Sequence, residues 1–383
     1  MADFGSSSFV TSSAVLSTYS PNRKRKSSRL LEKEQHRERM MEQVECPPIF
    51  KFGVISDIQY APVDDGVSFW GVPRYYKHAM DVAAAAAGTF EAENVDLCVN
   101  LGDIIDGKCT TEVKDKYCGL DSMKDVVSAL SNYTRGPIIH TYGNHELYNV
   151  DRNVLGDILN IPFAKEPCGN LVGYHSFVKH DVCFIVIDSY DVTMSQREET
   201  CKKYQRAKQI LEENNPNFSR NINSPEGLTG VQRRFVAFNG GLDKPQLEWL
   251  DRTLETVRNK RQKAIILSHQ PIHPKSTKGP TLIWNYDEVL QILRKYRKNV
   301  ALSLCGHAHR GGYHRDEPSG IHFRVIEAAL ESPRPINTFG IVDVYKDRLV
   351  LRGRGDCESA IYSFSHLHHK ESSDIHKAAI PED

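Results

Sequence analysis

Several side chains that can hold a cation stand directly after apolar stretches of this sequence. The central example is Asp103, which follows Gly102 shortly after residues 95–99, an apolar run typical of a buried strand. A carboxylate at the mouth of a strand suits a bound cation when a neighbouring glycine lets another backbone or a ligand approach closely. A turn closed by the aspartate side chain is the alternative for such a pair taken alone.

The same arrangement recurs at four other places in the sequence, which is more than chance would produce. Apolar runs at 52–56, 137–142, 264–268 and 300–305 are each followed by polar residues, in order Asp57 with Gln59, Asn144 with His145, His269, and His307 with His309. In open α/β sheets, ligands collect outside the carboxyl ends of the strands. Five strand ends of this kind predict one metal centre.

The types of side chain indicate which metals are suitable. Carboxylates, amide oxygens and imidazoles without a thiolate suit Mn²⁺, Fe²⁺ or Zn²⁺ rather than a structural zinc site built on cysteine. The candidates are too many for one ion: Asp57, Gln59, Asp103, Asn144, His269, His307 and His309. With one carboxylate bridging, they suit two ions roughly 3.5–4 Å apart. Alternate side chains of an extended segment share a face, so His307 and His309 can reach neighbouring metals.

Composition describes a globular protein with a sizeable core. The chain has 383 residues, of which 40% are hydrophobic and 26% are charged, so one large domain or two ordinary ones is expected. Lysine and arginine number 49, as do aspartate and glutamate, which argues against nucleic acid as a partner. No apolar run reaches the roughly 18 residues of a membrane helix. No membrane partner and no obligate protein partner is expected.

Nine cysteines without a CxxC pair predict reduced thiols and therefore an intracellular, cytoplasmic protein. Three of them lie in apolar runs and are expected in the core: Cys98, Cys183 and Cys305. Residues 1–47 form a Ser-rich, basic tail, with nine serines in the first 30 positions and a basic cluster at 23–26. We expect this tail to be disordered. An organelle transit peptide and a nuclear import signal are the alternatives.

The rest of the chain alternates strands and helices, which predicts an α/β fold. One folded domain is expected over residues 48–355, followed by a polar C-terminal tail over 356–383. Helices are expected at about 74–92, 121–133, 194–214, 244–258 and 286–297, with further strands at 182–187, 322–327, 339–345 and 348–352. An insertion at about 191–241 breaks the rhythm, and a connection of this length often caps a site.

The polar blocks resemble, in order, the signature of calcineurin-like metallophosphoesterases. The blocks are Asp57-Ile58-Gln59, Gly102-Asp103-Ile104-Ile105-Asp106, Gly143-Asn144-His145-Glu146, His269 and Gly306-His307-Ala308-His309, and the likeness covers about residues 49–355. Gln59 stands where most members carry histidine. Together with the flanks 54–61 and 238–242, this exchange resembles the branch of manganese-dependent ADP-ribose/CDP-alcohol diphosphatases.

The resemblance implies a four-layer α-β-β-α sandwich, in which two mixed sheets lie face to face with helices outside. It also implies two divalent metal ions that share Asp103. One ion would take Asp57, Gln59 and His309, and the other would take Asn144, His269 and His307. The neutral oxygen of Gln59 agrees with a preference for Mn²⁺ over Zn²⁺, because oxygen-rich coordination favours Mn²⁺.

The resemblance further implies hydrolysis of the pyrophosphate bond in ADP-ribose, CDP-choline, CDP-glycerol and related nucleoside diphosphate conjugates. The products would be a nucleoside monophosphate and a phosphorylated alcohol or sugar. His145 is placed to donate a proton or a hydrogen bond to the leaving phosphate, and Asp106 would orient it. A structural role for His145 and a helix-capping role for Asp106 are the alternatives. Phe69 lies in the loop after the first strand, where it could stack on the nucleobase.

Two other functions are compatible with the same residues. A phosphomonoesterase or a cyclic-nucleotide phosphodiesterase would keep the metal centre and change the substrate. A catalytically silent scaffold would keep the fold and lose metal ligands. Since no ligand block is eroded apart from the exchange at Gln59, the sequence favours an enzyme.

Overall fold

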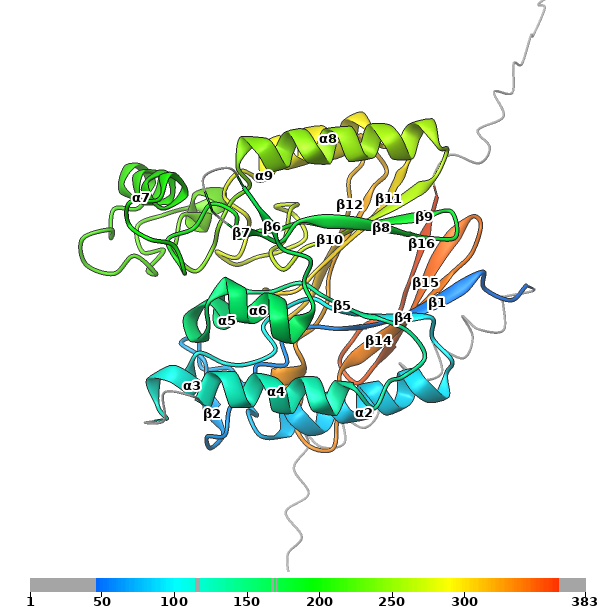
Figure 1. Cartoon of the computed structure of the whole chain (residues 1–383), viewed down its shortest axis with the longest axis horizontal. Helices are drawn as coiled ribbons and strands as arrows, with labels where there is room; N and C mark the ends of the chain where they lie inside the picture. The colour runs from blue at the N-terminus through cyan, green and yellow to red at the C-terminus, as the bar shows by residue number, and fades with distance from the viewer. Residues whose placement is uncertain (1–45, 114–117, 167–168, 170, 365–383) are drawn as a thin grey trace, which may run out of the picture. The chain divides into compact units, whose positions relative to one another are not determined.

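The computed structural model describes residues 46–113, 118–166, 169 and 171–364, which belong to one compact unit beginning at Cys46 (Figure 1). The predicted disordered N-terminal tail lies outside the described residues up to residue 45. The predicted polar C-terminal tail lies outside them from residue 365. Within the described ranges, no helix is long and apolar enough to cross a membrane.

Two mixed β-sheets make up the centre of the described part of the chain. The strands of the first are β1 (Phe50–Ile55), β4 (Leu97–Asn100), β5 (Ile138–His140), β14 (Phe339–Val344), β15 (Arg348–Arg354) and β16 (Ala360–Ser363), in the order β16-β15-β14-β1-β4-β5. Those of the second are β8 (His175–Lys179), β9 (Val182–Val186), β10 (Lys263–Leu267), β11 (Val300–Cys305), β12 (Gly312–Arg315) and β13 (His322–Val325), in the order β12-β13-β11-β10-β9-β8.

Both sheets have parallel strands at their centre, which directs their carboxyl ends to the same edge. In the first sheet β1 is parallel to β4, and β4 is parallel to β5. In the second, β9, β10, β11 and β13 are parallel neighbours. The outer pairs are antiparallel, including β14 with β1 and β8 with β9. The strands predicted to carry candidate ligands are therefore the parallel ones.

Helices cover the outer face of each sheet, which gives four layers (Figure 1). The helices α2 (His78–Ala92) and α4 (Cys118–Leu130) share an apolar core with the first sheet. The helices α8 (Lys244–Asn259) and α9 (Tyr286–Lys295) share another with the second. A third apolar core, with residues from β1, β4, β9, β10 and β11, lies between the sheets. The predicted four-layer sandwich is confirmed.

Side chains alternate between these layers as the strand period of two requires. In β1, Phe52 faces the neighbouring sheet, where its ring meets that of Phe184 edge to face at 5.4 Å between centroids. The next residue, Gly53, faces α2, and a Cβ there would come within 2.8 Å of the Phe90 ring. The cysteines expected in the core, Cys98, Cys183 and Cys305, are buried on β4, β9 and β11.

Shorter elements lie in the connections near the ligand-bearing strand ends. They are β2 (Gly66–Val67), β3 (Pro73–Arg74), α3 (Lys108–Thr111), α5 (Asn144–Asn149), α6 (Arg152–Leu159), β6 (Ala164–Lys165), β7 (Leu171–Val172) and the 3₁₀ helix η2 (Ala329–Glu331). The strands β2 and β3 form a hairpin, and for this reason α2 begins at His78 and not near residue 74 as expected.

The insertion at 191–241 contains α7 (Lys202–Asn214) and the 3₁₀ helix η1 (Gly230–Arg234). The helix predicted from residue 194 therefore begins eight residues later. Lys203 ties α7 to the rest of the domain, because its ammonium pairs with the buried carboxylate of Asp191 and with Glu166 Oε1 at 2.7 Å. Since a buried charge is costly without a partner, this contact holds the insertion in place.

The polar tail predicted from residue 356 is wrong at its beginning. Residues 360–363 form β16, which pairs with β15 through Leu349↔Tyr362 and neighbouring residues. The Tyr362 ring is fully buried, so this strand belongs to the folded domain. The strand has only four residues and is surrounded by polar sequence, so its pairing with β15 is what identifies it as an edge strand.

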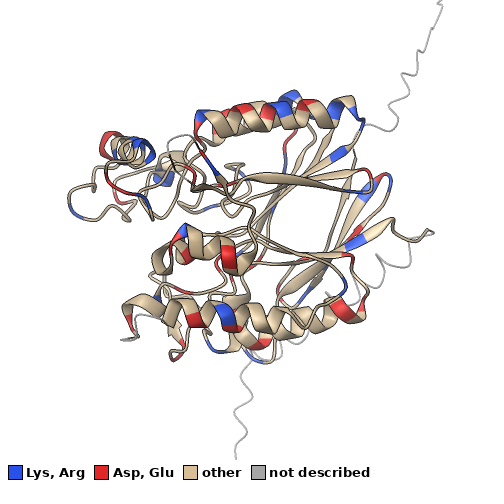
Figure 2. Cartoon of the chain, in the orientation of Figure 1, with Lys and Arg blue, Asp and Glu red and all other residues tan. Residues whose placement is uncertain are grey.

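Charged side chains gather on the outer helices and leave the strands between them largely apolar. Figure 2 shows lysines and arginines interspersed with aspartates and glutamates along α8, while the central strands carry few charges. The amphipathic helix α8 buries Leu250, Leu254 and Val257 toward the second sheet. The absence of a large single-sign field on these elements agrees with the balanced composition.

The inter-sheet core should respond strongly to loss of an aromatic ring at its centre. Phe184 is fully buried and contacts the rings of Phe50, Phe52 and Phe177. Phe184→Ala is expected to lower the free energy of unfolding by about 3–5 kcal/mol, because it leaves a cavity. Urea denaturation measures this. Val178→Ala, at a half-exposed position of the adjacent strand, is the control and should change it by about 0.5 kcal/mol or less.

Candidate metal centre

Backbone hydrogen bonds join the loops that follow the strands of the first sheet. Asp57 N–H donates to Gly102 O at 3.1 Å, and Gln59 N–H donates to Asp103 O at 2.8 Å. These bonds continue the pairing of β1 with β4 beyond the ends of the strands. They bring two predicted ligand blocks, 45 residues apart in sequence, into direct contact.

The second sheet contributes its strand ends to the same place. Gly306 N–H donates to His269 O at 2.9 Å, which joins the loops after β11 and β10. His307 N–H then donates to both oxygens of the Asp57 carboxylate, at 3.1 and 3.0 Å. The two sheets therefore meet at one edge through a contact between candidate ligand residues.

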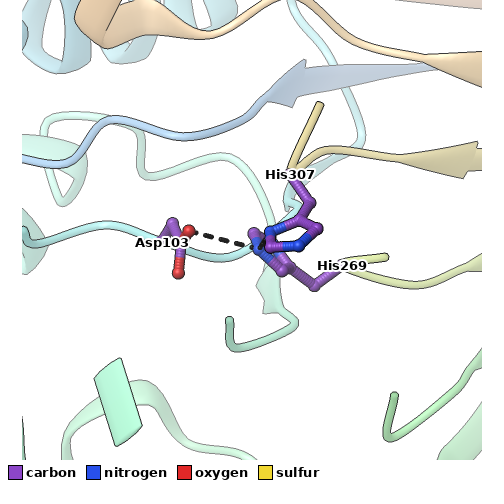
Figure 3. Close-up of side chains that lie close together, drawn as sticks. All are labelled: Asp103, His269 and His307. Carbon is purple, nitrogen blue, oxygen red and sulfur yellow. Dashed lines mark hydrogen bonds and ion pairs between the residues drawn. The ribbon is translucent and has the colours of Figure 1, made fainter. Parts of the chain in front are cut away.

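Three candidate ligands point toward one another from three different loops (Figure 3). Asp103 Oδ2 lies 3.2 Å from His269 Nε2, and His269 Nε2 lies 3.1 Å from His307 Nδ1. The three side chains are buried, and their ligand atoms lie within 4.8 Å of one another. A cation could therefore contact all three with small adjustments.

A second group of candidate ligands adjoins the other side of Asp103. Gln59 Nε2 lies 3.1 Å from Asp103 Oδ2 and 3.0 Å from His309 Nε2. His309 Nε2 in turn lies 3.5 Å from Asp57 Oδ1. Asp103 thus lies between the two groups, where the bridging role inferred from the sequence would put it.

Asn144 is placed beside the other candidate ligands by close packing of the preceding residue, Gly143. Gly143 packs so closely that a Cβ there would lie 2.0 Å from Asp103 Oδ1 and 2.6 Å from His269 Nε2, so only glycine fits. Asn144 follows as the first residue of α5 and is buried. The structure therefore brings all seven candidate ligands to one edge of the sandwich.

Four of these residues have a left-handed backbone, which is uncommon outside glycine. The φ angles are +49° for Asp57, +44° for Gln59, +54° for Asp103 and +65° for His307. Such conformations cost roughly 1–3 kcal/mol each and persist where the surrounding structure enforces them, commonly at functional sites. Here they turn side chains of successive loops toward one point.

The donor set has the properties that a divalent cation requires. The Oε1 atom of Gln59 is buried and has no hydrogen-bond donor among the described residues. A buried acceptor without a donor is costly, and a cation would satisfy it. His269 Nδ1 lies 2.7 Å from Leu101 O, and because a carbonyl can only accept, Nδ1 carries the proton. In the neutral ring, Nε2 of His269 is therefore the nitrogen with the lone pair, and it faces Asp103 and His307.

The candidate ligands Asp103, His269 and His307 shift one another's pKa values. Burial alone would raise the pKa of Asp103, but His269, His145 and His307 outweigh it and hold the pKa well below its usual range. Burial lowers the pKa of His269, yet the Asp103 carboxylate raises it to about 9. The pKa of His307 falls below its usual range through burial and the neighbouring His269. Asp103 and His269 therefore stabilise each other's charged forms in the chain without a metal.

His145 lies beside this cluster with a defined ring orientation. Its Nδ1 accepts the Gly107 N–H at 2.7 Å, so the proton of the neutral ring is on Nε2. The Asp106 carboxylate, expected to orient His145, faces the same Nδ1 at 3.5 Å, which is an ion-pair distance. Its other oxygen accepts the N–H of Lys108, the first residue of α3, at 2.9 Å. The hydrogen bond that orients the ring thus comes from Gly107.

Comparison with known proteins decides the family. The family model described as calcineurin-like phosphoesterase matches residues 50–311, about two thirds of the chain. This chain belongs to the calcineurin-like phosphoesterase family. The resemblance seen in the sequence is confirmed, and the matched range contains all five strand-end blocks described above.

Relatives from plants and animals share most of the chain. A protein from Oryza sativa subsp. japonica named manganese-dependent ADP-ribose/CDP-alcohol diphosphatase is 42% identical over 80% of this chain and 91% of its own. The protein of the same name from Homo sapiens is 33% identical over 82% of this chain and 93% of its own. Among solved structures, a dimetal phosphatase from Danio rerio superposes on this chain with a TM-score of 0.78 and 32% sequence identity. The match covers 83% of this chain and 100% of the phosphatase chain.

Phe69 lies apart from the ligands of this phosphoesterase, at the tip of the β2–β3 hairpin. Its side chain is 91% exposed, and its ring meets that of Trp70 edge to face at 5.0 Å. The base of the hairpin is tied to the site, since Arg74 Nη1 lies 3.5 Å from Asp106 Oδ2. Tyr76 is fully buried and belongs to the core. An exposed aromatic ring on an element anchored at the site is available to stack on a base.

Two residues that contact the candidate ligands, Glu146 and Tyr190, were not predicted from the sequence to have a role in the site. Glu146, in the third block, accepts backbone N–H groups from Gly143, Asp103 and Ile104 and so joins the loops after β4 and β5. Burial and the Asp103 carboxylate raise its pKa to about 7. Tyr190 Oη donates to Asn144 Oδ1 at 3.2 Å. The sequence placed Tyr190 after a strand, but nothing in its spacing indicated this contact.

Removal of the charge shared by the two groups tests the dinuclear centre of this phosphoesterase. Asp103→Asn is expected to abolish binding of at least one Mn²⁺ equivalent and to lower kcat by several orders of magnitude, because both cations lose a carboxylate ligand. Metal analysis after dialysis and a turnover assay measure the two effects. Circular dichroism controls for folding. A variant with two bound equivalents and near-normal turnover would contradict the bridging role of Asp103.

Proposed function

We propose that this protein hydrolyses the pyrophosphate bond of ADP-ribose, CDP-choline, CDP-glycerol and related nucleoside diphosphate conjugates. The products are a nucleoside monophosphate and a phosphorylated sugar or alcohol. The observation that carries the proposal is the buried group of Asp103, His269 and His307, with Gln59 and His309 beside it, in a chain whose relatives named manganese-dependent ADP-ribose/CDP-alcohol diphosphatase are 33–42% identical. Manganese is the expected metal, as in the names of those relatives and in keeping with the amide oxygen of Gln59.

Each cation would be held by ligands from both sheets. We assign Asp57, Gln59 and His309 to one cation, and Asn144, His269 and His307 to the other, with Asp103 shared. When bound, the two cations lower the pKa of a water molecule toward neutrality and balance charge on the phosphoryl oxygens. The chain's contribution is to hold the ligands on an enforced backbone, with little water access to the buried carboxylates.

His145 donates a hydrogen bond or a proton to the leaving phosphate through Nε2. Because the Gly107 N–H occupies Nδ1 at 2.7 Å, the neutral ring presents its proton from Nε2. The leaving group of a pyrophosphate is itself a phosphate, and protonation or a hydrogen bond lowers the charge that develops on its oxygen. The Asp106 carboxylate lies 3.5 Å from Nδ1, on the side of the ring away from Nε2.

A substrate panel tests the proposal directly. The purified protein is incubated with ADP-ribose, CDP-choline, p-nitrophenyl phosphate and a 2′,3′-cyclic nucleotide, each with Mn²⁺, Mg²⁺ or Zn²⁺. We expect release of AMP and CMP from the first two, fastest with Mn²⁺, with Asp103→Asn as the inactive control. Faster turnover of the monoester or the cyclic nucleotide would favour the alternative functions. A cytoplasmic location and the absence of nucleic-acid, membrane or obligate protein partners stay predictions from composition.

The proposed proton donor predicts a selective loss of rate. His145→Ala should lower kcat for ADP-ribose by about 10²–10⁴-fold, since general acid catalysis typically contributes that much. Both metal equivalents should stay bound, because Nε2 carries a proton and does not face the ligand cluster as an acceptor. Steady-state kinetics with metal analysis separates the two roles. Loss of one metal equivalent would identify His145 as a ligand instead.

The proposed base contact predicts an effect on binding alone. Phe69→Ala should raise KM for ADP-ribose and leave kcat unchanged, because stacking contributes equally in the ground and transition states. The expected cost is roughly 1–3 kcal/mol, the scale of base–aromatic stacking. p-Nitrophenyl phosphate, which lacks a base, is the matched control substrate. Equal impairment of both substrates would show that Phe69 acts through the fold of the hairpin.

A further inference from the structure

Two candidate ligand histidines make hydrogen bonds through the ring nitrogen that faces away from the cluster. His307 Nε2 lies 2.8 Å from Asn239 Oδ1, and His309 Nδ1 lies 2.9 Å from Glu331 Oε1. Asn239 belongs to the insertion at 191–241 and is fully buried, and Glu331 ends η2. Neither residue lies in any of the five ligand blocks.

The direction of both hydrogen bonds follows from the partners. A carboxylate can only accept, so His309 Nδ1 is the donor toward Glu331. The amide of Asn239 is oriented by its other atom, since Nδ2 donates to the carbonyl oxygens of Arg234 at 2.8 Å and Pro280 at 2.5 Å. Its Oδ1 therefore faces His307, and His307 Nε2 is the donor.

The opposite nitrogen of each ring is consequently left with its lone pair. For His307 this is Nδ1, which lies 3.1 Å from His269 Nε2. For His309 it is Nε2, which lies 3.5 Å from Asp57 Oδ1 and accepts from the Gln59 amide at 3.0 Å. A metal-binding imidazole must present a lone pair, and the hydrogen bond on its other nitrogen sets which nitrogen does so.

We propose that Asn239 and Glu331 are positioning residues that select the metal-binding tautomers of His307 and His309, one for each cation. The inference rests on the proposed dinuclear centre. In this proposal the insertion at 191–241 takes part in the metal centre, because Asn239, near the end of the insertion, holds the His307 ring in place. Glu331 adds a negative charge behind His309 and would so strengthen donation from this ring to a cation that Gln59 would contact through a neutral oxygen.

The same criterion separates ligand histidines from other histidines nearby. His145 Nδ1 accepts from Gly107 N–H, and His273 Nδ1 accepts from Lys275 N–H at 3.1 Å, so both keep a proton on Nε2. His273 lies with His314 and Asp316 in another group whose atoms are close enough for a metal. A cation there would have to displace the Nε2 proton from a ring whose Nδ1 already accepts. Among these histidines, only those backed by an acceptor are suited to bind metal.

The surroundings hold the two positioning residues in place. The segment leading to Glu331 is bonded to the ligand loops, since Ala328 N–H donates to His309 O at 2.9 Å and Leu330 N–H donates to Asp57 O at 3.0 Å. The carboxylate of Glu331 therefore moves together with the residues it serves. Asn239 is fixed by the two carbonyls that receive its amide protons. Both acceptors are thus preorganised and need no rearrangement when a cation binds.

The test measures Mn²⁺ binding to protein stripped with a chelator, by isothermal titration calorimetry without substrate. Glu331→Leu should weaken one of two Mn²⁺ equivalents about 10–100-fold, the usual effect of losing such a partner, and leave the other unchanged. Glu331→Gln keeps an acceptor oxygen and should restore most of the affinity. Glu327→Gln, which removes a carboxylate paired with Arg324 on the same segment, is the control and should leave both equivalents unchanged.

Variants of Asn239 separate tautomer selection from a merely structural role. Asn239→Asp keeps an acceptor toward His307 but loses the donors to Arg234 and Pro280, so thermal stability should fall while Mn²⁺ affinity is retained. Asn239→Leu loses both and should weaken one equivalent about 10–100-fold. The double variant with Glu331→Leu should weaken both equivalents, since each residue serves a different cation. If Asn239→Leu does not fold, Asn239→Ala, which also lacks an acceptor toward His307, takes its place in the comparison with Asn239→Asp.

Several outcomes would overturn the inference. They are unchanged affinity in Glu331→Leu, no rescue by Glu331→Gln, equal loss of affinity in Asn239→Asp and Asn239→Leu, or weakening of the same equivalent by both leucine variants. Because no substrate is present, the result does not depend on the reaction catalysed. Preference for a phosphomonoester in the substrate panel would refute the proposed diphosphatase activity and leave this result standing.

Discussion

The buried carboxylate of Asp103 is the constraint from which most of the site follows. A fully buried charge is tolerated only when opposite charges or hydrogen-bond donors surround it. Asp103 has His269 at 3.2 Å, the Gln59 amide at 3.1 Å and the His145 N–H at 2.9 Å around its two oxygens. These partners come from loops after three other strands, and they can reach one point only if the loops turn sharply. The left-handed backbone of the ligand residues and the glycines without room for a Cβ are the local consequences of that convergence.

Metal binding and proton donation are distinguished by what lies behind each imidazole. A carbonyl, an amide oxygen or a carboxylate behind the ring leaves a lone pair in front, as for His269, with Leu101 O at 2.7 Å. A backbone N–H behind the ring leaves a proton in front, as for His145, with Gly107 N at 2.7 Å. Neighbouring histidines of the same fold can therefore take opposite chemical roles, although their side chains are identical. The protein's own hydrogen bonds set which ring nitrogen of each neutral histidine carries the proton.

Most of the fold and of the ligand cluster could be predicted from the sequence, because both depend on local patterns. Apolar runs that end in Asp, Asn or His mark parallel strands, and parallel strands bring their ends to one edge. The partners behind the ligands could not be predicted in this way. Asn239 lies 68 residues from His307, and Glu331 lies 22 residues from His309, with no regular spacing to connect them. The start of α2 and the strand β16 were missed for a similar reason, since each depends on pairing with a segment that the local pattern does not reveal.

The position of the centre at the edge between the sheets explains why its polar residues do not destabilise the domain. Between the sheets the core is apolar, with Phe52 and Phe184 in edge-to-face contact, and it contributes the burial that a fold of this size needs. At the strand ends this core stops, and His307 N–H bonds to the Asp57 carboxylate across the boundary between the sheets. A cation held by residues of both sheets therefore joins the two halves where apolar packing no longer does. In this arrangement the catalytic centre and the contact between the sheets share the same side chains, so a change in either is felt by the other.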